Sequence, residues 1–349
     1  MHDVDYIVLY EKKKQEDVIC INNMFSNAES ILSCYNINEY NKNMSNISNL
    51  IEKNNIKQLI FLGIEEGRDK LFVEISNKYP DIKIKVICNT QDSLLYDDTE
   101  RNNFLKLLDL SKKGIVYDIA FLRKGQYETY RELGYKCSFL MENYILDNEC
   151  ISNVNDIENN KNVEKDKEEE IIIGIYPLEY KWEKNIFNQF SISRFIENSK
   201  TRYIEVNERI TEFLDKMKIE KEAVKFQSIN EKFLISELIK SDINIECSFT
   251  EYFHLIFFIS MELGIPCLLG NTSDLFIESI KINEEETYIE NIEKLETYIV
   301  TDTEDNPLYN SEKVKVIIDK KEEIMKLYKE WKEAYNKISD DNKMKFINK

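Results

Sequence analysis

The stretch "TEYFHLIFFISMELGIPC" (residues 250–267) decides how the second half of the chain folds. Its apolar residues cover nearly every side of a helix, which predicts a helix buried inside a domain rather than one lying on a surface. Short apolar runs flank it at 242–247 and 265–270, and both are expected to be buried strands. A strand, a buried helix and a second strand are typical of an open α/β sheet, with Glu251 in the first turn of the helix.

The beginning of this helix is an expected anion site. Amides in a first helical turn have no partner within the helix and carry the positive end of its dipole. We expect the amides of Tyr252, Phe253 and His254 to point at the end of strand 242–247, the edge where ligands sit in such sheets. The alternative is that Glu251 merely complements the dipole, which is worth about 0.3–1 kcal/mol.

Length and composition limit the possible classes of protein. A chain of 349 residues with 42% apolar and 11% aromatic residues is expected to form two domains. The net charge of −18 argues against nucleic acid and against an anionic membrane surface as partners, because both are bound by clustered Lys and Arg.

Reactive residue types are few. Seven cysteines at irregular spacings indicate neither a disulfide framework nor a zinc site, and two histidines argue against a Ser-His-Asp triad or a His-rich metal site. The first apolar run is too short for a signal peptide, and no segment approaches the roughly 20 apolar residues of a membrane span. We therefore expect a cytoplasmic protein without a transmembrane segment.

The first half of the chain alternates strands and helices, which predicts a mostly parallel sheet with helices on both faces. The expected strands are 6–10, 58–63 and 84–88, followed by a strand and turn at 117–125, and the expected helices are 67–80, 100–114 and 126–134. Gly134 is expected to end the last of these helices at the C′ position.

A second α/β series follows a charged, Asn-rich segment at 151–170, which is the best linker candidate. The expected strands are 171–176, 202–206, 224–227, 242–247 and 265–270, with helices at 183–198, 208–217 and 231–240 and from 311 to the end. The predicted organisation is an N-terminal Rossmann-like domain (1–150), the linker (151–170), a C-terminal Rossmann-like domain (171–310) and terminal helices (311–349).

The segment "SDINIECSFTEYFHLIFFISMELGIPCLLGNTSDLF" (241–276) resembles the donor-binding segment of retaining GT-B glycosyltransferases of the glycogen-synthase-like family. In that family a strand ends at a small hydroxyl residue, a Glu opens a helix, and a Gly-x-Pro begins the next strand. Ser248, Thr250, Glu251, Gly264 and Pro266 match these positions.

Other parts of the chain carry the same resemblance. "GIYPLEYKWEKN" (174–185), "YIVTDTEDNP" (298–307) and the terminal helix are similar to the family, so the resemblance covers roughly 171–335. It implies a GT-B fold, in which two Rossmann-like domains enclose a cleft and the terminal helix crosses back onto the first domain.

The resemblance also implies a mechanism that needs no metal and no cofactor, and it implies roles for individual residues. Glu251 would contact the hydroxyls of the transferred sugar, and Thr250 would lie beside it in the donor site. Lys181 or Lys184 would supply the cation that compensates the donor diphosphate, because the family places a basic residue after the first strand of this domain. The plain alternative for both lysines is a solvated surface position.

The chain departs from the family pattern at two places. A second acid, which holds the nucleotide ribose, follows the first by eight residues in the family, but Ile259 stands there. Related chains also place a His after the strand equivalent to 84–88, where this chain has Cys88, Asn89 and Thr90.

Several residues have ordinary structural interpretations. Gly63 favours a simple βα turn over a phosphate or acceptor loop. Trp182 and Trp331 are interpreted as packing residues, and Cys247 and Cys267 as buried apolar fillers. His254 could contact a phosphate or serve as a buried structural group.

Two functions are carried forward from the sequence. The first is a glycosyltransferase that moves a sugar from a nucleotide diphosphate sugar to a glycan, protein or lipid-linked acceptor with retention. The second is a catalytically lapsed GT-B subunit that binds or scaffolds an active glycosyltransferase, and a homodimer is a further possibility. A third alternative is an unrelated doubly wound sensor or binding protein.

Overall fold

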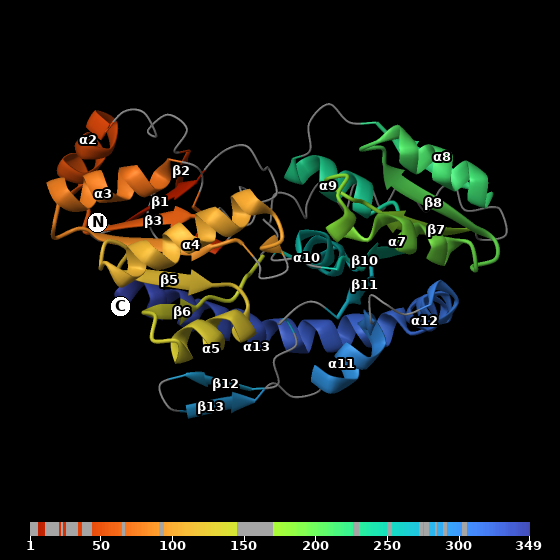
Figure 1. The fold of residues 1–349 in the computed structure, drawn as a ribbon. Helices are drawn as coiled ribbons and strands as arrows, with labels where there is room; N and C mark the ends of the chain where they lie inside the picture. The colour runs from red at the N-terminus through yellow and green to blue at the C-terminus, as the bar shows by residue number, and fades with distance from the viewer. Residues whose placement is uncertain are drawn as a thin grey trace. The chain divides into compact units, whose positions relative to one another are not determined.

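The structure is a computed structural model in two compact units, comprising Met1–Asn143 with Lys337–Lys349, and Tyr144–Asn336 (Figure 1). It describes residues 6–10, 21, 24–25, 34–36, 44–64, 67–90, 94–144, 170–225, 230–249, 253–271, 275, 279–282, 285–288, 292–301 and 306–349. The segment predicted as a linker therefore lies outside the described residues, apart from Glu170.

The first unit is built on a six-stranded parallel sheet with the order β2-β1-β3-β4-β5-β6. Its strands are β1 (Tyr6–Tyr10), β2 (Cys34–Asn36), β3 (Gln58–Leu62), β4 (Lys83–Cys88), β5 (Asp118–Phe121) and β6 (Cys137–Phe139). Its helices are α2 (Met44–Asn54), α3 (Arg68–Lys78), α4 (Asp98–Lys112) and α5 (Lys124–Glu132).

The two faces of this sheet bury different groups, because successive side chains of a strand point to opposite sides. Ile84 and Val86 belong to the apolar core that also contains Phe72 of α3 and Phe104 of α4. Lys85 lies between them and faces the other side, where its Nζ donates to the carbonyls of the last turn of α13 (Lys321–Asn348). The end of α13 therefore covers the second face of the sheet.

The second unit contains another six-stranded parallel sheet, with the order β14-β11-β10-β7-β8-β9. The strands are β7 (Ile171–Ile175), β8 (Ser199–Ile204), β9 (Lys221–Val224), β10 (Ile243–Glu246), β11 (Cys267–Gly270) and β14 (Val300–Thr301), and β12 (Ser279–Ile282) pairs with β13 (Glu285–Tyr288). The helices are the 3-10 turn η3 (Trp182–Lys184), α7 (Ile186–Ser193), α8 (Glu208–Met217), α9 (Glu231–Leu238), α10 (Leu255–Glu262), α11 (Ile292–Ile299) and α12 (Pro307–Asp319).

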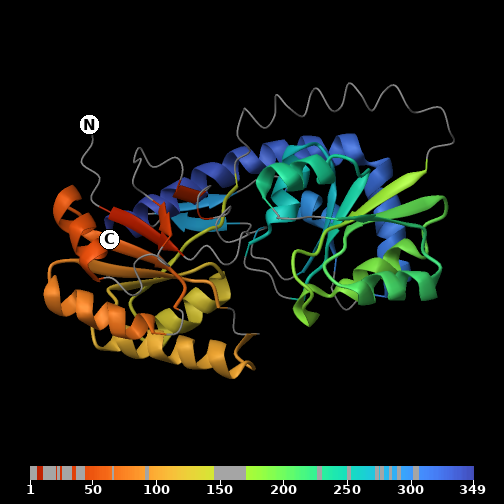
Figure 2. The same ribbon diagram turned by 90° about the horizontal axis from the view of Figure 1, so that it is seen from above.

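Helix α10 is the buried helix that its composition predicts, and every residue from Leu255 to Met261 is buried. On one side it packs on β10 and β11, and on another it meets α13 (Figure 2). The rings of Phe258 and Trp331 stack at 18° with centroids 6.4 Å apart, so Trp331 is the packing residue that the sequence predicts.

The predicted α/β fold class is confirmed, and the main elements agree with their predicted ranges within a few residues. Gly134 follows α5 with a φ of 84°, as its predicted C′ position requires. The predicted terminal helix is two helices that meet at Lys320. The strands β2, β6, β12, β13 and β14 and the helices α2 and α11 lie outside the sequence prediction.

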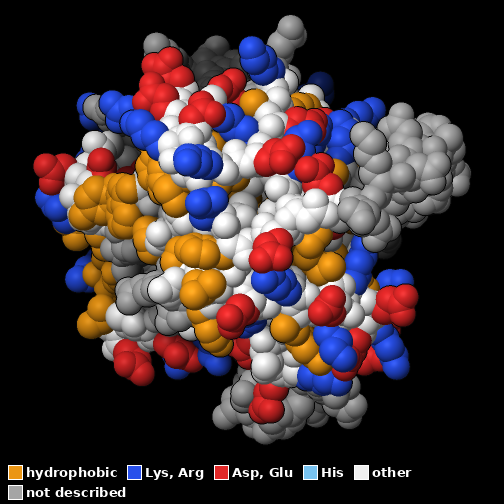
Figure 3. Space-filling model, turned by 90° about the vertical axis from the view of Figure 1, so that its right-hand side faces the viewer, with side chains coloured by type: hydrophobic (Ala, Val, Ile, Leu, Met, Phe, Trp, Pro, Cys, Tyr) orange, Lys and Arg blue, Asp and Glu red, His pale blue; other side chains and the backbone are white. Residues whose placement is uncertain are grey.

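Acidic and basic side chains both occur on the visible surface (Figure 3). Figure 3 shows a face on which acidic, basic and hydrophobic side chains are interspersed. Among the residues that the structure describes, none of the helices is long and apolar enough to cross a membrane.

Candidate functional site

The strand order of the second unit indicates where a ligand can bind. Counted from β7, the order reads 3-2-1-4-5-6, so the chain reverses its direction of winding between β7 and β10. In open α/β sheets, ligands bind outside the carboxyl ends of the two strands at this point. We call the connections that follow β7 and β10 the switch-point edge.

Hydrogen bonds join the two connections of the switch-point edge. The Nδ2 of Asn185 donates to the carbonyl of Cys247 over 2.9 Å, and the amide of Phe249 donates to the carbonyl of Glu183 over 2.8 Å. Asn185 itself is buried and has a φ of 50°, a conformation that Asn tolerates better than most residues. The segment with the predicted lysines is thus held against the segment that leads to Glu251.

Lys181 and Lys184 stand at the two ends of this short turn. Lys181 is exposed, and its Nζ lies 2.6 Å from Glu179 Oε2 in an ion pair that water screens. Lys184 is half-buried, and its carbonyl accepts a hydrogen bond of 2.6 Å from the Nε2 of Gln189. Their predicted contact with a diphosphate stays a prediction.

The helix that was expected to begin at Glu251 begins at Leu255, and His254 is its N-cap. The reason is a carboxylate from β10, because Glu246 Oε2 accepts the amide of Phe257 over 2.9 Å. The amide of Phe253 therefore precedes the helix instead of belonging to its first turn. Thr250, Glu251 and Tyr252 lie outside the described residues, so their predicted roles stay predictions.

Three of the predicted donor-binding residues have buried side chains. Phe253 and His254 are each 1% exposed and Ile259 is 0% exposed. The Nδ1 of His254 lies 4.0 Å from Glu246 Oε2 inside the unit, which favours the structural interpretation of this histidine over a phosphate contact. Their side chains are therefore enclosed by the unit and do not face solvent.

Buried polar hydrogen bonds anchor β10 and the end of β7, the two strands that lead to the switch-point edge. Asn244 donates from Nδ2 to Ser260 Oγ over 2.9 Å, and the hydroxyl of Tyr176 donates to the carbonyl of Glu237 over 3.0 Å. Burial raises the pKa of Tyr176 well above its usual range, so its hydroxyl stays protonated.

Gly174 lies against the same buried polar residues. A Cβ at Gly174 would lie 2.0 Å from the Oδ1 of Asn244 and 2.4 Å from the Oγ of Ser241, so no side chain fits there. A lone Gly in the apolar run "IIIGI" was the available sequence signal for this close approach.

The first unit has its own polar edge after β3 and β4. Gly63 has a φ of 66°, and a Cβ there would lie 2.4 Å from the Oδ1 of Asn89. Thr90 donates from Oγ1 to Glu100 Oε2 over 3.0 Å, and its carbonyl accepts the Nε2 of Gln126 over 3.1 Å. Gly63 thus supports a tight βα turn, in agreement with the favoured interpretation of the sequence.

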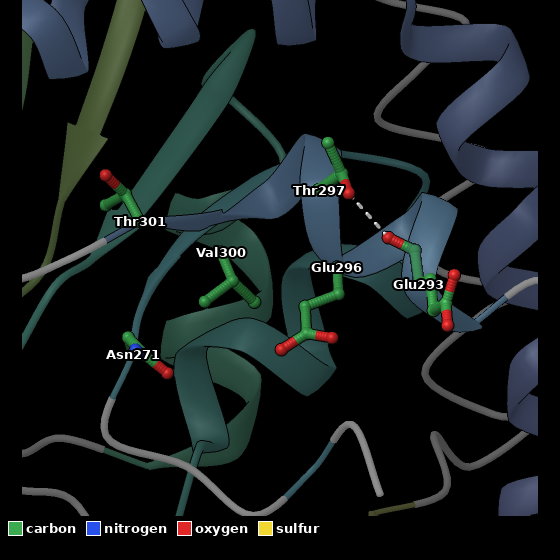
Figure 4. A pocket seen from close by; sticks show the side chains of 6 residues that line it. All are labelled: Asn271, Glu293, Glu296, Thr297, Val300 and Thr301. Atoms are coloured by element: carbon green, nitrogen blue, oxygen red, sulfur yellow. Dashed lines mark hydrogen bonds between the residues drawn. The ribbon is translucent and has the colours of Figure 1, made fainter. Parts of the chain in front are cut away.

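A hollow of about 270 Å³ lies at the carboxyl ends of β11 and β14 (Figure 4). It is lined by Asn271, Glu293, Glu296, Thr297, Val300 and Thr301. Two carboxylates in an open hollow disfavour a diphosphate, so this hollow is a poor candidate for the donor site. Across the described ranges, no group of three or more His, Cys, Asp or Glu side chains could hold a metal ion.

No protein-family model matches the chain, and no curated protein sequence does. Solved structures are similar in fold. Anabaena HepE in complex with UDP has a TM-score of 0.66 at 6% identity, covering 99% of both chains. Sucrose-phosphate synthase from Thermosynechococcus elongatus has a TM-score of 0.63 at 10% identity, covering 95% of this chain and 94% of that chain.

A third structure is an α,α-trehalose-phosphate synthase (UDP-forming) from Burkholderia xenovorans in complex with glucose-6-phosphate. Its TM-score is 0.62 at 8% identity, and the match covers 95% of this chain and 83% of that chain. Taken with the two parallel α/β units, these similarities establish the fold of the chain, which is the GT-B fold of glycosyltransferases.

Proposed function

We propose that this chain is a glycosyltransferase that moves a sugar from a nucleotide diphosphate sugar to a glycan, protein or lipid-linked acceptor, with retention of anomeric configuration. The observation that carries the proposal is the switch-point edge. There the turn with Lys181 and Lys184 is hydrogen-bonded to the connection that leads to Thr250 and Glu251.

The similar folds support the same class of reaction. The sucrose-phosphate and trehalose-phosphate synthases are named for the sugar phosphates that they make, the trehalose-phosphate synthase is described as UDP-forming, and HepE is in complex with UDP. Their identities to this chain are 10% or lower, so the substrates of this chain are inferred from its own residues.

The proposed reaction needs charge stabilisation more than covalent chemistry. As the glycosidic bond to the diphosphate breaks, negative charge grows on the leaving phosphate oxygens, and Lys181 and Lys184 would stabilise it. Glu251 would hold the sugar by its hydroxyls and set its orientation toward the acceptor. The proposal requires no metal ion, because the two ammonium groups supply the positive charge.

A binding or scaffolding subunit is the second candidate, and two observations favour it. Ile259 is fully buried where the family pattern has a ribose-binding acid, and Glu246 places a carboxylate against the beginning of α10. Such a subunit would keep the GT-B fold and act with an active glycosyltransferase or with a second copy of this chain.

Thermal unfolding with UDP, GDP and their sugars tests the proposal. A ligand at 100 times its dissociation constant adds about 2.7 kcal/mol of stability, which is readily measured. We expect one nucleotide family to stabilise the protein and Glu251→Ala or Lys184→Ala to abolish the shift. Lys216→Ala is the matched control, because this exposed lysine lies on α8.

Turnover separates the two candidates. Hydrolysis or transfer of the bound sugar, followed by NMR of the anomeric proton, supports the transferase and reports retention or inversion. Binding without turnover in the presence of maltose, glucose-6-phosphate or a peptide acceptor favours the scaffolding subunit. Silence across the whole panel contradicts a donor site for UDP or GDP sugars and favours the scaffolding subunit.

A further inference from the structure

Asn185 joins two elements of the switch-point edge in a conformation that few side chains adopt. It is the C-cap of η3 and the N-cap of α7, with a φ of 50° and a ψ of 34°. This left-handed region suits Gly and is tolerated by Asn, whereas most other side chains are strained in it. A Gly would make the same turn, so the backbone alone does not require the carboxamide of Asn185.

The carboxamide of Asn185 connects the two segments of the switch-point edge. Its Nδ2 donates to the carbonyl of Cys247 over 2.9 Å, and the two residues are 6% and 2% exposed. Cys247 directly follows β10, so this bond fixes the turn to the end of that strand. The bond is not easily replaced, because a buried carbonyl that loses its donor finds no water in its place.

Asn198 provides a comparison within the same unit. It has nearly the same backbone conformation, with a φ of 52°, but the residue is exposed. It lies at the amino end of β7, where its carbonyl accepts the amide of Ile171 over 2.8 Å. Asn198 thus serves as a turn residue through its main chain, whereas the side chain of Asn185 is buried and joins two segments.

The main chain of Lys184, the residue before Asn185, is held on both sides. Its amide donates to the carbonyl of Lys181 over 3.2 Å, and its carbonyl accepts the Nε2 of Gln189 over 2.6 Å. The bond from Asn185 to Cys247 then sets where this ordered turn lies relative to β10. Because a lysine carries its ammonium on a flexible four-carbon stem, the place that the ammonium reaches depends on where its main chain is fixed.

We propose that Asn185 is a positioning residue for the donor diphosphate, because its side-chain bond holds Lys184 at a fixed distance from the end of β10; this inference rests on the proposed function. Asn185 need not touch the ligand. It keeps the ammonium of Lys184 where negative charge grows on the leaving diphosphate, and a misplacement of about 1 Å there weakens the interaction strongly.

The expected effect is partial, because a second bond joins the same two segments. The amide of Phe249 donates to the carbonyl of Glu183 over 2.8 Å. Loss of the bond from Asn185 therefore loosens the turn and does not detach it. Affinity for the diphosphate should fall, while the fold of the unit persists.

Calorimetric titration with UDP, GDP and ADP measures the effect. Asn185→Gly keeps the left-handed turn and removes the carboxamide, so we expect it to weaken binding of the nucleotide that wild type binds by about tenfold. Asn198→Gly is the matched control, because it makes the same substitution in the same conformation at the opposite edge of the sheet. Its dissociation constant should stay within about twofold of wild type.

A double-mutant cycle with Lys184 separates positioning from a general loss of stability. If Asn185 acts through Lys184, Asn185→Gly has little further effect on affinity once Lys184→Ala has removed the ammonium. A merely structural role gives the same fold loss in both backgrounds. Gln189→Met removes the other side-chain bond to this turn and should show the same coupling with a loss of about threefold, so it carries the test if Asn185→Gly does not fold.

Failure of the inference and failure of the proposed function give different results. If wild type binds a nucleotide and Asn185→Gly binds it equally well, the positioning role is overturned and the donor site stands. An equal loss in Asn198→Gly, or equal fold losses with and without Lys184, overturns the positioning role as well. Absence of binding of UDP, GDP and ADP by wild type contradicts a donor site for these nucleotides and overturns both proposals.

Discussion

Two helix ends in this molecule meet a buried charge of the opposite sign. At the beginning of α10, Glu246 accepts the amide of Phe257 over 2.9 Å, and at the end of α13 the ammonium of Lys85 donates to the carbonyl of Ile347 over 3.0 Å. Glu246 is 9% exposed and Lys85 is 0% exposed. The chain thus supplies its own counter-charge at both helix ends.

The comparison changes how ligand binding in the second unit is explained. The positive end of α10 is an anion site that a side chain of the protein has already entered. A diphosphate at the switch-point edge therefore depends on Lys181 and Lys184 more than on the helix dipole. In the first unit, the end of α13 is likewise occupied by a side chain of the protein, because Lys85 donates to its last carbonyls and holds the helix against the sheet.

Gly174→Ala has the largest expected effect, because it disturbs the strand pair that carries Glu246 without changing any charge. The new Cβ would lie 2.0 Å from Asn244 Oδ1, and such overpacking costs about 3 kcal/mol. Urea unfolding measures the loss. Gly125→Ala is the matched control, since a Cβ there meets nothing within 4 Å, and an equal loss in both variants would contradict the explanation.

Removing the charge at α10 is expected to cost about 2 kcal/mol, because Glu246→Ala leaves the buried amide of Phe257 without its acceptor. Glu246→Gln keeps an oxygen acceptor and should lose less. If a diphosphate binds nearby, Glu246→Gln should also tighten its binding, since a like charge is gone. Calorimetric titration with UDP or GDP decides this point, and unchanged binding would place the diphosphate away from α10.

Removing the charge at α13 is expected to cost slightly less, about 1.5 kcal/mol for Lys85→Ala. Two carbonyls lose a donor, but the desolvation of a buried ammonium is relieved at the same time. The measurement is the midpoint of urea unfolding. Lys83→Ala is the comparison on the same strand, and its exposed bond to the carbonyl of Lys349 should contribute less.

The same lysine gives a pH dependence of known sign. Burial lowers the pKa of Lys85 from 10.5 to about 8, against an opposing effect of Asp118. Between these values the unfolded chain binds more protons than the folded chain, so stability rises with pH from about 8 to 10.5. The two pKa values limit the gain to about 3 kcal/mol, and it is seen as the difference between wild type and Lys85→Met. Parallel pH profiles of the two proteins would rule out this titration.

The smallest expected effect concerns the other end of α10. There the hydroxyl of Tyr328 donates to Glu262 Oε1 over 2.9 Å, and Tyr328→Phe should cost about 0.5–1 kcal/mol. Glu262→Gln should be nearly neutral, because it removes an acid from the negative end of a helix. A loss above that of Glu246→Ala would reverse the ranking of the two helix ends.

Local patterns predicted much of the fold. The apolar composition around Phe257 and Phe258 predicts a buried helix, and the apolar runs at β3, β4, β7 and β10 predict buried strands, because these signals lie within a few neighbouring residues. The structure holds the turn with Lys181 and Lys184 against the connection that leads to Glu251. Trp182, which was interpreted as a packing residue, contacts the ring of Phe249 but is 56% exposed, because exposure depends on what surrounds a side chain rather than on its type.

Sequence alone determined that alternating strands and a wholly apolar helix would form two layered α/β units, because periodicity and side-chain volume act locally. Only the tertiary structure decided where α10 begins, because the carboxylate that meets its amide is eleven residues away on another element. It likewise decided that Lys85 would face the end of α13, 261 residues further along the chain. These contacts between a charged side chain and a helix end form only when the chain folds, and no spacing along the chain predicts them.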